Sequence, residues 1–215
     1  PTWPRSRWTE RLSRARRGLV VTDVALKVAV VVLLAFALTH PHWDRFADKA
    51  MGARAVLYPL LVAVPALLWL VARWRAGRAD RPAPPYPLLA DVLLTIPFVV
   101  DLAGNALDLY DDVSWFDDAC HLGNWALLSG AFGCAIVGRG LPPWAVFGLV
   151  WGFGAVIAVL WEIGEYGAFI LDTPEGVTAY RDTIGDLMLG LTGSLVAAVV
   201  AASAERRRTS GSRQP

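Results

Sequence analysis

Residues 143–170 read PWAVFGLVWGFGAVIAVLWEIGEYGAFI, and this stretch decides the fold. Its only charged residues are Glu162 and Glu165, and a run of about 20 apolar residues is long enough to cross the hydrocarbon core of a bilayer as a helix. A carboxylate at the centre of a bilayer costs roughly 2.5–3.5 kcal/mol even on the mildest scale. The stretch therefore predicts a transmembrane helix whose two acidic side chains have a compensating partner.

Further apolar stretches of similar length predict an all-α, polytopic membrane protein with a bundle of about six transmembrane helices. The whole sequence is 55% hydrophobic, more than is usual in a soluble domain. We expect a single transmembrane domain over 19–204, between a basic N-terminal segment (1–18) and a C-terminal tail (205–215). Its six helices are expected at 19–38, 55–72, 87–109, 118–138, 143–170 and 183–204.

Arginine is concentrated on one side of the expected membrane domain. The N-terminal segment, the second and fourth loops and the C-terminal tail hold most of the chain's 20 lysine and arginine residues. Because cytoplasmic loops carry the excess of basic residues, both termini are predicted to be cytoplasmic. The loops 39–54, 110–117 and 171–182 then face outward.

Polar side chains recur near the outward end of four of these helices, at spacings that place each set on one helical face. Because the sets share a depth, Asp101, His121, Glu162 and Asp186 are predicted to converge on a common centre. Helix by helix, the members are Asp101, Asn105 and Asp108; Asp118 and His121; Glu162 and Glu165; and Asp182 and Asp186.

Carboxylates around one imidazole suit a divalent cation such as Mg, Mn or Zn. Shared protons on some of the acids are the alternative way to reduce the buried charge. The candidate metal ligands are Asp101, Asp118, His121, Glu162, Glu165, Asp182 and Asp186. The candidate catalytic groups are Glu162, Glu165 and His121, and the candidate substrate-binding groups are Arg181 and Asn105.

Three motifs resemble the YjdF-like family of predicted bacterial inner-membrane proteins. They are PFVVDLAGNALDLY at 97–110, DDACHLGNW at 117–125, and LWEIGEY at 160–166 followed by YRDTIGDL at 180–187. A looser set, namely His121, Glu162, Arg181, Asp186 and Gly190, resembles VanZ-like membrane proteins. The resemblance implies a multi-pass protein of the bacterial cytoplasmic (inner) membrane, and it implies no particular reaction.

Three functions remain open from the sequence. The first is a metal-dependent enzyme at the outer leaflet that acts on a lipid or polyprenyl phosphate, with the ion polarising a phosphoryl oxygen or activating water. The second is a proton- or cation-coupled transporter, because intramembrane acids and histidine also form proton relays. The third is a structural or partner-binding membrane protein. In each case the lipid bilayer is the expected partner, and the net charge of only +1 argues against nucleic acid.

Overall fold

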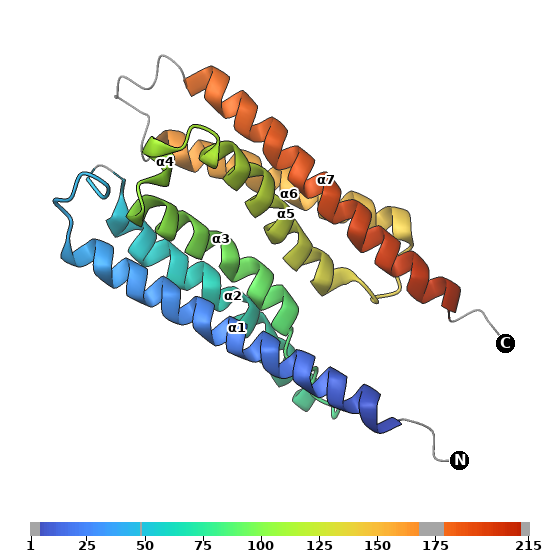
Figure 1. The fold of residues 1–215 in the computed structure, drawn as a ribbon. Helices are drawn as coiled ribbons and strands as arrows, with labels where there is room; N and C mark the ends of the chain where they lie inside the picture. Colours follow the sequence, from blue (N-terminus) through green and yellow to red (C-terminus); the bar gives the residue numbers. More distant parts are fainter. Residues whose placement is uncertain (1–4, 48, 168–178, 212–215) are drawn as a thin grey trace.

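The computed structural model describes residues 5–47, 49–167 and 179–211, which form helices joined by turns, without a strand (Figure 1). This confirms the predicted all-α fold. Six of the helices are long and one, α4, is a single turn. They are α1 (Arg5–Thr39), α2 (Met51–Arg78), α3 (Leu88–Ala106), α4 (Leu109–Asp112), α5 (Phe116–Ile136), α6 (Pro143–Glu165) and α7 (Ala179–Gly211).

The long helices run alternately up and down, so the start of α1 and the end of α7 lie at one end of the bundle and α4 lies at the other (Figure 1). Within the described residues, α1, α2, α3, α6 and α7 are each long and apolar enough to cross a membrane. Helix α5 falls short by composition because its first turns carry Asp117, Asp118, His121 and Asn124. The histidine therefore enters the bundle on a helix whose first turns are polar.

Two hydrophobic cores hold the bundle together. In one, Tyr58 and Leu102 pack with residues of α1, α2 and α3. In the other, Val146 and Val150 of α6 pack against alanines of α7, such as Ala198. The two halves meet where α3 packs against α5. A site between α3 and α5 therefore lies between two separately packed units.

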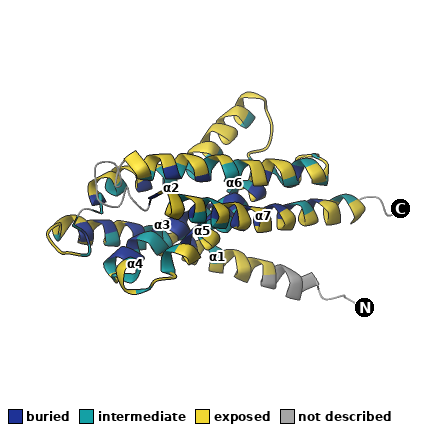
Figure 2. Cartoon of the chain, turned by 90° about the horizontal axis from the view of Figure 1, so that it is seen from above, coloured by how far each residue is buried: buried dark blue, intermediate teal, exposed yellow. Residues whose placement is uncertain are grey.

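The outward faces of the helices remain apolar. In Figure 2 buried residues gather where helices face one another, and exposed residues cover the outside. Many of the exposed residues are valine and leucine, for example Val31 on α1 and Leu60 on α2. A soluble protein rarely exposes so continuous an apolar surface, so the surface is that of a protein surrounded by lipid.

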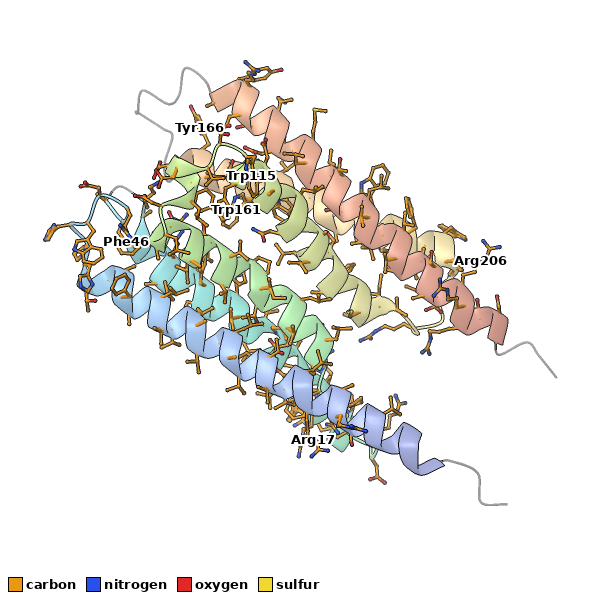
Figure 3. All side chains as sticks on the ribbon, in the orientation of Figure 1. Arg17, Phe46, Trp115, Trp161, Tyr166 and Arg206 are labelled. Carbon is orange, nitrogen blue, oxygen red and sulfur yellow. The ribbon has the colours of Figure 1, made fainter. Side chains whose placement is uncertain are left out.

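Arginines of the first part of α1 and the last part of α7 lie at one end of the bundle. In Figure 3, Arg17 and Arg206 lie toward the end where α1 starts and α7 finishes, whereas Phe46, Trp115 and Tyr166 lie toward the α4 end. This distribution agrees with the arginine asymmetry of the sequence, on which the predicted orientation rests.

Small residues allow helices α5, α6 and α7 to pack closely. A Cβ at Gly193 would lie 2.1 Å from the carbonyl oxygen of Leu122, and a Cβ at Gly154 would lie 2.0 Å from Ser194 Oγ. Ser129 donates a hydrogen bond to Ser194 at 3.0 Å in this contact. Gly148 and Gly152 differ, because a Cβ at either one would meet nothing within 4 Å in the described structure.

The third helix, expected at 87–109, ends earlier in the structure than the sequence predicted. Helix α3 ends at Ala106, and Asp108 adopts a left-handed conformation with φ of 63° before the short helix α4. The predicted stripe of Asp101, Asn105 and Asp108 therefore does not form, since Asp108 lies outside the helix. Asp tolerates this conformation better than most residues. At the end of the expected fifth helix, 168–170 lie outside the described residues.

A buried group of ionisable side chains links α1 to α3. Lys27 of α1 forms ion pairs with Asp23 at 2.8 Å and with Asp91 of α3 at 2.6 Å, and Tyr86 also donates a hydrogen bond to Asp91. Asp91 is fully buried. These contacts stabilise the pairing of α1 with α3.

Candidate functional site

The candidate site is built around His121, on the second turn of α5. Its Nδ1 lies 3.1 Å from Asp186 Oδ1 of α7 and 3.5 Å from Asp117 Oδ2, one turn back on α5. Its Nε2 lies 3.5 Å from Glu162 Oε1 of α6. His121, Glu162 and Asp186 are all at least nine-tenths buried. The predicted convergence of these three residues is thus present, and α5, α6 and α7 supply one member each.

The two ring nitrogens of His121 have different surroundings. Nδ1 lies 3.2 Å from the main-chain oxygen of Asp117, and a carbonyl oxygen only accepts hydrogen bonds. Nδ1 therefore carries the proton in this contact, and the neighbouring Asp186 carboxylate favours the same tautomer. Nε2, the other ring nitrogen, faces Glu162. Histidines that bind metals are commonly oriented in this way by a carboxylate or carbonyl on the other nitrogen.

Glu162 has an oxygen that its surroundings leave unsatisfied. Oε1 is buried and has no hydrogen-bond partner among the described residues, although it faces His121 Nε2. Glu165 lies one turn further along α6, and ligand atoms of His121, Glu162 and Glu165 all lie within 4.8 Å of one another. A buried polar atom without a partner costs about 1–3 kcal/mol. An ion bound between these three residues would remove that cost.

A second set of three potential ligands, Asp117, His121 and Asp186, meets the same distance criterion. The two sets share His121, so four carboxyl groups surround one imidazole. The basic residues that line the adjoining cavity, Lys49 and Arg54, form their ion pairs elsewhere, with Asp111 and Asp101. The cluster therefore favours a cation over an anion.

Asp101 belongs to a different cluster, on the other wall. Arg54 Nε donates a hydrogen bond to Asp101 Oδ2 at 2.9 Å, and Nη2 donates to Oδ1 at 3.3 Å. Tyr58 donates to Oδ2 at 2.6 Å. Asn105 and Tyr110 each donate to Oδ1 at 3.3 Å. Asp101 is therefore paired with Arg54 and belongs to neither set of potential metal ligands around His121 in the described residues.

Tyr110 lies on α4, outside the long helices, and keeps its proton. Burial, followed by the nearby Asp101 carboxylate, raises the pKa of Tyr110 well above its ordinary value. The phenol is therefore a hydrogen-bond donor at all physiological pH values, which is the role that it has toward Asp101.

One cavity of about 480 Å³ separates the two clusters. The Asp101 cluster lines one side, through Arg54, Tyr58, Asp101 and Asn105. The histidine cluster lines the other side, through Asp117, His121 and Glu165. Figure 3 shows Trp161, a further lining residue, within this end of the bundle. The volume is in the range of pockets that bind small organic ligands.

Several candidate residues lie away from this cavity. Asp118, Arg181 and Asp182 are exposed in the first turns of α5 and α7. Asp118 was expected beside His121 at i, i+3, but Asp117 takes that place at i, i+4. Both spacings are allowed on a helix, and only the rotation of α5 against its neighbours decides between them.

The residues that neutralise Asp101 were not predicted from the sequence. The expected second helix started at 55, so Arg54 was assigned to a loop, whereas α2 begins at Met51. Arg54 and Tyr58 are four residues apart and therefore share a face. The spacing could have indicated that Arg54 and Tyr58 act together, but it does not identify Asp101 on α3 as their partner.

Comparison with known proteins identifies a family but no characterised relative. No curated protein and no solved structure matches the chain. Residues 22–207 match a family described as predicted membrane protein, DUF2238. The match covers every long helix of the bundle from within α1 to within α7, and the chain therefore belongs to the DUF2238 family of predicted membrane proteins.

Proposed function

We propose that this protein is a divalent-metal-dependent enzyme of the bacterial inner membrane that acts on a lipid or polyprenyl phosphate. The observation that carries the proposal is the unsatisfied Glu162 Oε1 facing His121 Nε2. Among the described residues this atom has no hydrogen-bond donor, and a bound cation would supply the missing interaction. Mg, Mn and Zn are all compatible with carboxylate and imidazole ligands.

In this proposal the ion is bound by His121, Glu162 and Glu165. Three protein ligands leave coordination positions for water and substrate, as in catalytic metal sites. Asp186 orients His121 through Nδ1 rather than binding the ion directly. The ion would polarise a phosphoryl oxygen or lower the pKa of a bound water.

A phosphate at this position would be held mainly by the proposed ion, because Lys49 and Arg54, which line the same cavity, are paired with Asp111 and Asp101. Arg181, the clamp expected from the sequence, is exposed on α7. The arginines at the other end of the bundle favour a cytoplasmic location for that end, so the cavity would open toward the outer leaflet. We further propose that the chain is one of the YjdF-like proteins, on the motifs at 97–110, 117–125, 160–166 and 180–187.

Elemental analysis combined with a turnover assay tests the proposed function. The purified protein should contain about one divalent ion per chain and release phosphate from a polyprenyl phosphate when loaded with Mn. Glu162→Gln should lose both properties, while Asp118→Asn, an exposed acid on the same helix as His121, should keep them. Absence of bound ion in the wild-type protein after Mn loading would contradict the proposal.

Transport is a second candidate, which the buried cluster of Asp23, Lys27 and Asp91 favours. Asp91 is fully buried, and its Oδ1 has no hydrogen-bond partner among the described residues. A transporter would need polar groups along its path across the membrane, and α3 carries Asp91 near one end and Asp101 nearer the other. Ion flux into proteoliposomes that is lost in Asp91→Asn but retained in Asp80→Asn, without turnover of a lipid phosphate, would favour this candidate over the enzyme.

A further inference from the structure

The lining of the cavity changes from charged to apolar along each helix that forms it. On α5 the lining residues run from Asp117 and His121 to Trp125 and Leu128. Leu128 lies about 16 Å deeper along the helix axis than Asp117, at a rise of 1.5 Å per residue. The charged end is the α4 end of the bundle, and the apolar end points toward the middle of the membrane domain.

Helices α3 and α6 repeat this order in the opposite chain direction. On α3, Asn105 and Asp101 lie nearer the α4 end and Phe98 lies deeper. On α6, Glu165 lies nearer that end and Trp161 lies one turn deeper. Three helices thus present the same polarity gradient to one space, so the gradient is a property of the cavity and not of a single helix.

We infer that the cavity binds an amphiphile with its headgroup at the α4 end and the first carbons of its chain against Phe98, Trp125 and Leu128. A lipid in a bilayer already has its polar group at the interface and its chain directed inward, which is the polarity order of this cavity. A water-soluble phosphate would leave the apolar floor in contact with water. The identity of the headgroup as a phosphate rests on the proposed function.

Binding of alkyl phosphates of increasing length tests this inference. Ethyl, butyl and octyl phosphate are titrated into the Mn-loaded full chain in nanodiscs, with empty nanodiscs as the blank. Longer chains also partition more strongly into the bilayer, which raises the apparent affinity of every variant equally. The quantity compared is therefore the ratio of variant to wild-type Kd at each chain length.

Leu128→Trp fills the apolar end of the cavity. Ethyl phosphate has too short a chain to occupy that end, so the ratio of variant to wild-type Kd should be close to one for ethyl phosphate. For octyl phosphate the ratio should rise to about tenfold or more, because each methylene excluded from an apolar site is worth about fourfold in affinity. Leu122→Trp is the matched control, since Leu122 is on the same helix, does not line the cavity and has an exposed side chain. Its ratio should stay near one throughout.

A ratio that does not depend on chain length in Leu128→Trp would overturn the inference, whether the ratio is near one or uniformly raised. Mn titration of each variant is measured alongside, and Leu128→Phe replaces Leu128→Trp if the latter no longer binds Mn. Failure of the wild-type protein to bind Mn would contradict the proposed function. A flat ratio with normal Mn binding contradicts only the orientation of the amphiphile.

Discussion

Arg54 and Asp101 form a two-point ion pair between α2 and α3, with N···O distances of 2.9 and 3.3 Å. Both side chains are largely buried. An isolated carboxylate at this depth would be costly, but a planar guanidinium matches both of its oxygens. Tyr58 completes the shell at 2.6 Å. The pair forms part of one wall of the cavity. The proposed metal ligands come from the opposite wall, around His121.

Removal of the guanidinium should be strongly destabilising. Arg54→Met leaves Asp101 buried without its counter-charge, and such a change costs about 3–5 kcal/mol. Adding Asp101→Asn should recover a large part of that loss, because the remaining amide is uncharged. Both effects are measured by denaturant unfolding in detergent. Lys49→Met is the control, since its partner Asp111 is exposed and such pairs are worth about 0–1 kcal/mol. Equal losses for Arg54→Met and Lys49→Met would show that the buried pair has no special role.

Chelation should lower the thermal stability of the protein. An ion that binds only the folded state at 100 times its Kd adds about 2.7 kcal/mol, so EDTA should lower Tm and added Mn or Zn should restore it. Glu162→Gln should abolish the response, and Asp118→Asn should preserve it. If EDTA has no effect while the wild-type protein is more stable at acidic pH, the carboxyls share protons instead of a metal. If neither treatment matters and Glu162→Gln is as stable as wild type, the cluster only links helices.

Substitution of Asp186 should weaken metal binding without removing a ligand. Asp186 contacts His121 Nδ1 at 3.1 Å, and loss of such an orienting carboxylate typically costs 10–100-fold in metal affinity. Asp186→Asn should therefore bind Mn more weakly, with an EPR spectrum like that of the wild type. Glu162→Gln, which removes a proposed ligand, should change the spectrum itself. A changed spectrum in Asp186→Asn would instead identify Asp186 as a direct ligand.

Two glycines should respond oppositely to alanine. In Gly193→Ala the new Cβ would lie 2.1 Å from the main-chain oxygen of Leu122, and backbone cannot rotate away as a side chain can. Overpacking of this kind costs about 1–3 kcal/mol. A Cβ at Gly148 would meet no described atom within 4 Å. Gly148→Ala should therefore be neutral or mildly stabilising, because alanine is the better helix former. Unfolding of both variants in one detergent gives the comparison.

The predicted topology can be tested by labelling single cysteines introduced at Arg45, Val113, Arg78 and Ser210, in a background without Cys120 and Cys134. The first two lie at the α4 end and the last two at the other end. Arg45 and Val113 should react with an impermeant reagent from outside the cell, and the other two only after lysis. The reverse pattern would contradict the orientation. Position 176, a further outward-facing candidate in the sequence, lies outside the described residues.

The sequence was sufficient for the fold and for part of the site. Hydropathy predicted the long helices, and buried charge identified His121, Glu162 and Asp186, because an ionisable group inside a membrane needs a partner. The choice of Asp117 over Asp118 depends on the rotation of α5, and the pairing of Arg54 with Asp101 depends on contact between α2 and α3. Neither is encoded by spacing within one helix. Asp108 was misplaced since its left-handed conformation ends α3 two residues before it.

The cavity wall around Asp101 is built from both sides of the 79–87 connection, and this affects how the protein could be taken apart. His121, Glu162 and Asp186 all follow the 79–87 connection in the chain, whereas Arg54 and Tyr58 precede it. A chain cut in that connection would keep the complete ion-binding half on one fragment. The other fragment would contribute the counter-ion of Asp101, so Asp101 would act as the docking point on which the two fragments reassemble.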